Sequence, residues 1–121
     1  MPITSDMWSS ILIESVTVEQ VERALKYLAD TDVNHAAAKC LAKGLDAQLK
    51  TIRAVEFMGA TGNNAEREHQ AYASQAYKDA LTRWQDACLE YETMQNKRER
   101  ACLTVEMFRT LEASRRVGNI R

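Results

Sequence analysis

Proline, glycine and aromatic residues are scarce in this sequence of 121 residues. It has one Pro, at position 2, four Gly, and 7% aromatic residues. Because Gly and Pro mark most turns, so few of them leave little room for a sheet, and the abundant Ala favours helix. We therefore predict an all-α fold, and the length predicts a single domain, residues 1–121.

Cysteine is also limited, to three residues with no CxxC spacing. An odd number without that spacing excludes a disulfide framework and a zinc site, and it suits a reducing compartment. Cys40 approaches Cys88 in a helical hairpin, but we favour two buried free thiols over a bridge between them. The third thiol, Cys102, is too far along the same helix to bridge Cys88.

No long apolar run is present. The longest candidate, residues 11–13, is too short for a signal peptide or a membrane span, so we expect a cytoplasmic protein that contacts no membrane. The net charge of −1 excludes a general basic field. Charge is nevertheless uneven, because residues 97–121 carry 7 basic and 3 acidic groups on an otherwise acidic chain.

The dominant pattern is a stretch of residues, 64–116, without Pro or Gly. Its apolar and small residues recur at heptad spacing, which predicts one long helix that buries a stripe against a partner helix. The predicted core or oligomer seam contains Tyr77, Trp84, Tyr91, Met94, Val105 and Phe108.

Upstream of this helix, residues 6–30 are predicted to form one or two short helices. Thr17 with Gln20 resembles a capping box at the start of the second of these. The β-branched residues 11–18 leave an extended conformation open for the first.

A further helix is predicted from a fresh cap at 30–32 to residue 58. Its apolar face would include Val33, Cys40, Leu49 and Val55, and Gly44 would let the neighbouring helix approach closely. Residues 59–64 form the only interior loop signal, with Asn64 as the next N-cap.

These elements predict a long antiparallel helical hairpin, similar to a coiled coil, with helices at about 32–58 and 64–116. The first is roughly 40 Å long and the second roughly 78 Å. We expect the short N-terminal helices to cover part of the overhang at 93–116. A homodimer or higher oligomer would bury the rest.

Catalytic and metal sites are not predicted. Glu66 and His69 have the Glu-x-x-His spacing of di-iron bundles, but His35 would lie more than about 30 Å away along the hairpin. Neither His is level with a nucleophile, so no Ser-His-Asp or Cys-His set forms. We therefore expect a protein that is not an enzyme and has no cofactor.

The basic C-terminal segment is the candidate binding surface. Its residues are Lys97, Arg98, Arg100, Arg109, Arg115 and Arg116. One interpretation is a solvated helix face, which the interleaved acids Glu99, Glu106 and Glu112 support. The other is a surface that binds phosphates or a protein partner. Arg98 occupies a seam position, where a charge commonly fixes register.

Four stretches of the sequence resemble a family of small helical proteins of tailed bacteriophages and prophages. They are YLADTD at 27–32, ASQAYK at 73–78, YET with NKR at 91–98, and RTLEASRRVGNI at 109–120. The resemblance covers about residues 20–121, although family members often have Trp where this chain has Phe108. Their genes tend to lie beside recombination and replication genes. This implies an accessory in phage DNA metabolism, or alternatively an inhibitor that blocks a host defence protein or its nucleotide signal.

Overall fold

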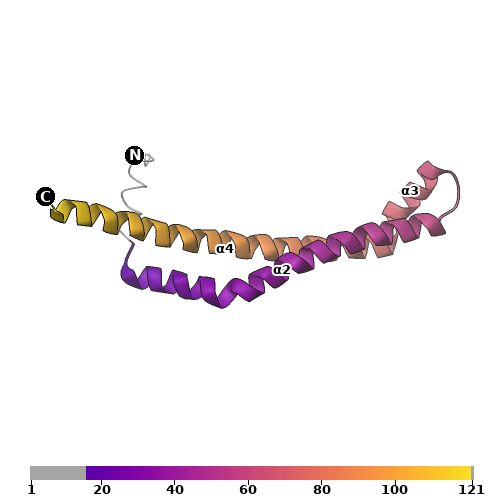
Figure 1. Cartoon of the computed structure of the whole chain (residues 1–121). Coiled ribbons are helices and arrows are strands. Elements are labelled where there is room, and N and C mark those ends of the chain that lie inside the picture. The colour runs from indigo at the N-terminus through magenta and orange to yellow at the C-terminus, as the bar shows by residue number, and fades with distance from the viewer. Residues whose placement is uncertain (1–15, 121) are drawn as a thin grey trace, which may run out of the picture. The chain divides into compact units, whose positions relative to one another are not determined.

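The computed structural model describes residues 16–120, which form three helices. These are α2 (Val18–Gly59), α3 (Asn64–Ala73) and α4 (Gln75–Ile120) (Figure 1). The long helices α2 and α4 pack antiparallel, with the short α3 between them in sequence. The all-α prediction is confirmed. None of the helices in this part of the chain is long and apolar enough to cross a membrane.

Two compact units make up the fold. The hairpin unit is Val33–Met94, and it contains the end of α2, all of α3 and the start of α4. The terminal unit pairs the described residues up to Asp32 with α4 from Gln95 onward. In each unit, one stretch of α2 packs against one stretch of α4.

The capping box predicted at the start of α2 is confirmed. The Thr17 amide donates to Gln20 Oε1 at 2.8 Å, and the Gln20 amide donates to Thr17 Oγ1 at 3.2 Å. This reciprocal pair satisfies two donors that the first turn of a helix leaves open.

The predicted break at residues 30–32 is wrong, because α2 continues through it. The Thr31 hydroxyl donates to the Tyr27 carbonyl, one turn earlier, at 2.6 Å. A threonine that bonds back to its own helix does not start a new one. Residues 18–30 are therefore the first part of a long helix rather than a short N-terminal helix. The prediction for residues 6–15 lies outside the described residues.

The loop after α2 is confirmed, but its cap is Asn63 rather than Asn64. The Asn63 side chain accepts from the Glu66 amide at 2.9 Å. Gly62, just before it, has φ 108°, a left-handed conformation that L side chains rarely adopt. A Cβ there would also collide with the Glu66 side chain, so this position requires glycine.

The long helix predicted over 64–116 is interrupted at Ser74, which separates α3 from α4. Ser74 has an extended backbone, its hydroxyl donates to the Ala71 carbonyl at 2.8 Å, and it accepts from the Tyr77 amide at 3.2 Å. One serine thus ends α3 and begins α4, because its side chain replaces the helix's own hydrogen bonds. The heptad pattern continues through Ser74, so it did not predict this break.

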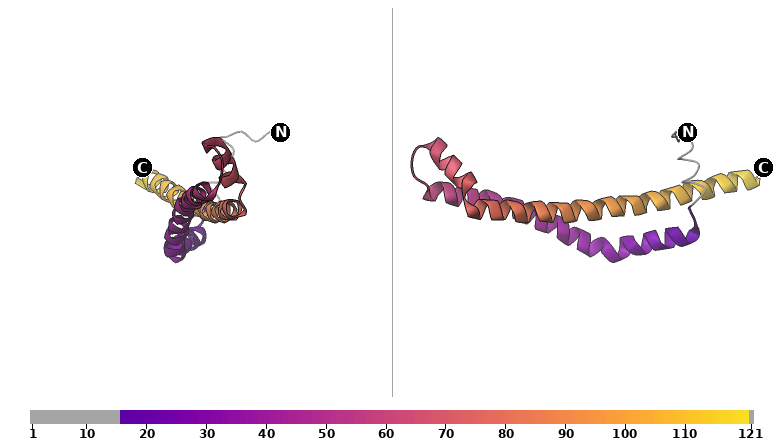
Figure 2. Two further views of the ribbon diagram at one scale, coloured as in Figure 1. Left: turned by 90° about the vertical axis from the view of Figure 1, so that its right-hand side faces the viewer. Right: turned by 180° about the vertical axis from the view of Figure 1, so that it is seen from behind.

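The short helix α3 lies beside the last turns of α2 (Figure 2). A side chain of α3 and one of α2 hold the two helices together. Arg53 donates to the Tyr72 hydroxyl at 2.9 Å, and the Tyr72 ring meets Tyr77 edge-on with centroids 5.2 Å apart. Gln70 bonds twice to the Thr61 backbone across the loop. Contacts of Tyr72, just before Ser74, with Arg53 of α2 and Tyr77 of α4 therefore stabilise the break.

The core consists mainly of small residues. The buried hydrophobic residues are Val21, Ala24, Ala42, Leu49, Ala71, Ala80, Ala87 and Ala101. The larger predicted seam residues, including Trp84 and Phe108, are only half-buried around these alanines. The cysteines depart from prediction: Cys40 and Cys102 are exposed and Cys88 is half-buried, so none is a buried thiol.

Candidate nucleic-acid interface

Arg98 anchors α4 to α2 within the terminal unit. Its guanidinium donates to the Leu28 carbonyl at 2.8 Å and to the Thr31 hydroxyl at 2.7 Å, and it lies 3.4 Å from the Asp32 carboxylate. The Arg98 side chain is 17% exposed, whereas Asp32 is 77% exposed. The charge-assisted bonds to Leu28 and Thr31 therefore matter more than the solvated ion pair with Asp32.

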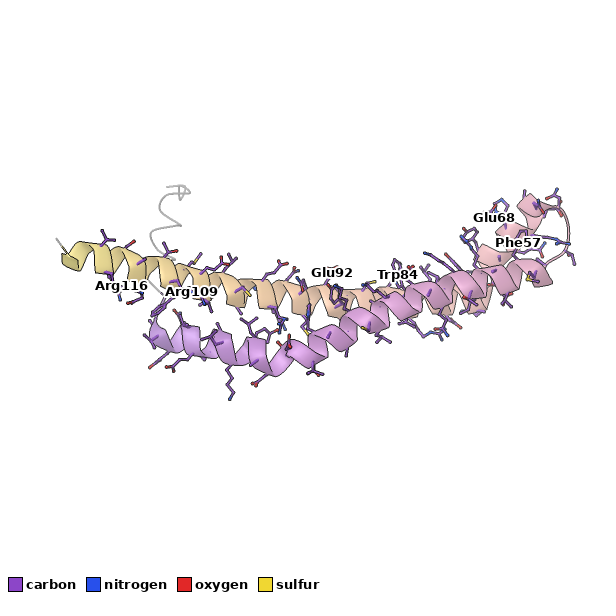
Figure 3. All side chains as sticks on the ribbon, in the orientation of Figure 1. Phe57, Glu68, Trp84, Glu92, Arg109 and Arg116 are labelled. Atoms are coloured by element: carbon purple, nitrogen blue, oxygen red, sulfur yellow. The ribbon has the colours of Figure 1, made fainter. Side chains whose placement is uncertain are left out.

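The other five basic residues predicted from the sequence are exposed. Arg115 donates to Glu112, on its own helix, at 3.0 Å. Within residues 16–118, Lys97, Arg100, Arg109 and Arg116 form no ion pair with a carboxylate. Figure 3 labels Arg109 and Arg116 on α4. Four of the six predicted residues thus remain available to an outside anion.

Helical spacing distributes these cations over two sides of α4. At about 100° per residue, Lys97 and Arg100 lie on one flank of the packed face that contains Ala101. Arg109 and Arg116 lie on the other flank, two turns apart. Glu99 and Glu106 occupy the back of the helix. The basic residues therefore border the packed face, away from Glu99 and Glu106, whereas Glu112 lies on the same flank as Arg109 and Arg116.

A shallow, open groove runs between α2 and α4 in the terminal unit. Arg23 and Tyr27 line it from α2, while Arg100, Thr104 and Met107 line it from α4. Two guanidinium groups from different helices can bind one phosphate, and an aromatic ring beside them can stack on a base. The groove thus combines the groups that nucleic acids and nucleotides require.

Arg23 and Tyr27 were missed by the sequence predictions. From the sequence, residues 18–30 were assigned only an apolar helix face. In the structure, Arg23 and Tyr27 line the same groove as Arg100 of α4. A signal was present, because a cation and an aromatic residue one helical turn apart share a face.

The two histidines have separate, unrelated surroundings. The His35 ring stacks on Tyr91 with centroids 5.3 Å apart, and His69 is exposed on α3. Within the part of the chain that the structure describes, no three His, Cys, Asp or Glu side chains are grouped to hold a metal ion.

Comparison with known proteins does not assign a function. No protein-family model matches the sequence, and neither a curated protein nor a solved structure is similar enough to count as a match.

Proposed function

We propose that this chain is a non-enzymatic helical binding protein that acts in phage DNA recombination or replication through the basic segment 97–116. The observation that carries the proposal is the exposure of Lys97, Arg100, Arg109 and Arg116 without a carboxylate partner among the described residues. Unpaired cations attract nucleic-acid phosphates without regard to sequence. The resemblance to small phage proteins supports the biological setting.

Two of the predicted binding residues take different roles in this proposal. Arg98 is a positioning residue, because its guanidinium is occupied by Leu28 and Thr31. Arg115 contributes less than its neighbours, because Glu112 already neutralises part of its charge. Arg23 and Tyr27, across the groove, complete the surface. A single strand whose phosphates meet Arg23 and Arg100 can stack a base on Tyr27.

Salt dependence is the expected signature of this binding. If about four phosphates are neutralised, the affinity for a single strand falls about 50-fold between 50 and 200 mM salt. Fluorescence anisotropy with labelled single- and double-stranded oligonucleotides measures it. The triple variant Lys97→Gln/Arg100→Gln/Arg109→Gln should lose most of the binding and flatten the salt slope.

The matched control is Lys39→Gln/Lys78→Gln/Arg83→Gln, which removes the same charge from exposed residues of the hairpin unit. It should retain nearly full affinity. No binding at low salt, or equal loss in both triple variants, would refute the nucleic-acid proposal.

The groove favours a second candidate function, an anti-defence protein that binds a nucleotide signal. Its two arginines, Arg23 and Arg100, come from different helices and suit the phosphates of a nucleotide. Calorimetric titration with a panel of mononucleotides and cyclic dinucleotides tests this candidate. Binding that Arg23→Gln abolishes, without any affinity for DNA, would favour it over the DNA proposal.

A further inference from the structure

The groove of the terminal unit is apolar where its two helices meet. Ala24 of α2 and Ala101 of α4 line it there and are buried, at 8% and 9% exposure. Tyr27 and Met107 also line the groove, but they are only half-buried. Part of the surface of these two larger side chains is therefore open to a ligand that enters the groove.

The register of the two helices places Tyr27 beside both arginines of the groove. The hydrogen bonds of Arg98 to α2 set this register. Because α2 and α4 are antiparallel, Arg100 lies about 3 Å nearer the start of α2 than Arg98 does, at the level of Tyr27. Arg23 lies one turn before Tyr27 on α2 itself and lines the same groove.

The two arginines carry the only strong charges of the groove. Arg23 and Arg100 are exposed, and within residues 16–118 neither forms an ion pair with a carboxylate. No acidic side chain is among the described residues that line the groove. Glu19 and Glu22, the acids of α2 nearest to Arg23 in sequence, lie about 140° and 160° around the helix from Ala24. The groove therefore attracts an anion.

A double helix cannot use the interior of such a groove. Its bases are paired and stacked on one another, so their flat faces are covered, and an aromatic side chain reaches them only when they are unstacked. An unpaired base stacks on an aromatic ring whatever its sequence. Exposed arginines, in contrast, attract the phosphates of either form. Tyr27 is therefore the residue of the groove that can tell a single strand from a duplex.

We propose that this groove selects the unpaired nucleotides of a single strand over a duplex. Tyr27 stacks on a base, while Arg23 and Arg100 bind the phosphates on either side of it. The inference rests on the proposed function, the binding of nucleic acid, and adds both the form of nucleic acid and the residue that selects it.

Substitutions of Tyr27 test the selection. Fluorescence anisotropy at low salt compares a labelled single strand with a duplex of the same length, and the wild-type protein should bind the single strand more tightly. Tyr27→Ala should weaken single-strand binding at least about fivefold and leave duplex binding unchanged. Tyr27→Phe, the matched control, keeps the ring and should retain both affinities. Far-ultraviolet circular dichroism should show that both variants remain helical.

Photo-crosslinking tests the position of the base without any substitution, so it stays decisive if Tyr27→Ala does not fold. A single strand that contains bromouracil is irradiated in complex with the wild-type protein, and mass spectrometry identifies the attached residue. The proposal predicts attachment at Tyr27. Attachment only to residues of the hairpin unit would overturn it.

The failure of this inference differs from the failure of the proposed function. Equal affinity for the strand and the duplex, unchanged in Tyr27→Ala, overturns the selection of single strands but leaves nucleic-acid binding in place. The absence of binding to either form at low salt overturns both. Displacement of the strand by an equimolar mononucleotide would assign the groove to a free nucleotide, which also overturns the selection of a strand.

Discussion

Arg98 and Arg109 show how two arginines on one helix take different roles. Both belong to the basic segment by sequence, but Arg98 contacts three residues of α2 whereas Arg109 is exposed without an ion pair in the described chain. Proximity in sequence therefore does not determine function on a helix. The two residues lie within about 20° of each other around an ideal helix, so the acceptors that α2 presents opposite Arg98 make the difference.

Replacing Arg98 with alanine should lower the free energy of unfolding by about 1–3 kcal/mol, because the charge-assisted bonds to Leu28 and Thr31 are lost. Lysine should recover only part of this, since it lacks the planar fork of donors. Urea unfolding followed by circular dichroism measures the change. Arg109→Ala, the control, should stay within about 0.5 kcal/mol. Equal losses in the two alanine variants would contradict the anchoring role.

Two hydroxyl residues, Ser74 and Thr31, lie where the observed helix boundaries differ from the predicted ones. Ser74 divides what the sequence predicts as one helix, and Thr31 continues what it predicts as two. Both side chains can either cap a helix or bond back within it. Thr31 bonds back within α2, and its hydroxyl also accepts a hydrogen bond from Arg98, which is 67 residues further along the chain. Sequence patterns near either residue do not contain that information.

Ser74→Ala should destabilise the protein by about 1 kcal/mol, because α4 loses the side chain that accepts from the Tyr77 amide. The comparison is Ser114→Ala, at an exposed position inside α4, where alanine should be neutral or slightly stabilising. Thermal unfolding of both variants measures the difference. A gain in stability from Ser74→Ala would show that the break between α3 and α4 is not needed.

Local signals were sufficient for several elements. The Thr17–Gln20 box, the loop near Gly62 and the helical class follow from short-range chemistry and were predicted correctly. The buried face of α2 was not predicted correctly, and neither was a close helix approach at Gly44, where a Cβ would meet no atom within 4 Å. Val33 and Leu49 are both apolar, and only the packing of α4 determines which of them is buried. For the same reason, the groove beside Arg100 required the structure.

At the scale of the whole molecule, the chain offers two surfaces of different chemistry. The terminal unit presents the exposed cations of segment 97–116, and the hairpin unit presents exposed apolar residues of α2, among them Val33 and Val55.

The molar mass in solution, measured by light scattering at low and high salt with and without a single-stranded oligonucleotide, tests this account most directly. The account predicts twice 13.7 kDa without DNA at both salt concentrations. It predicts a mass increase equal to bound DNA at low salt, which disappears at high salt. A single-chain mass that DNA leaves unchanged at low salt would contradict both the expected homodimer and the basic interface.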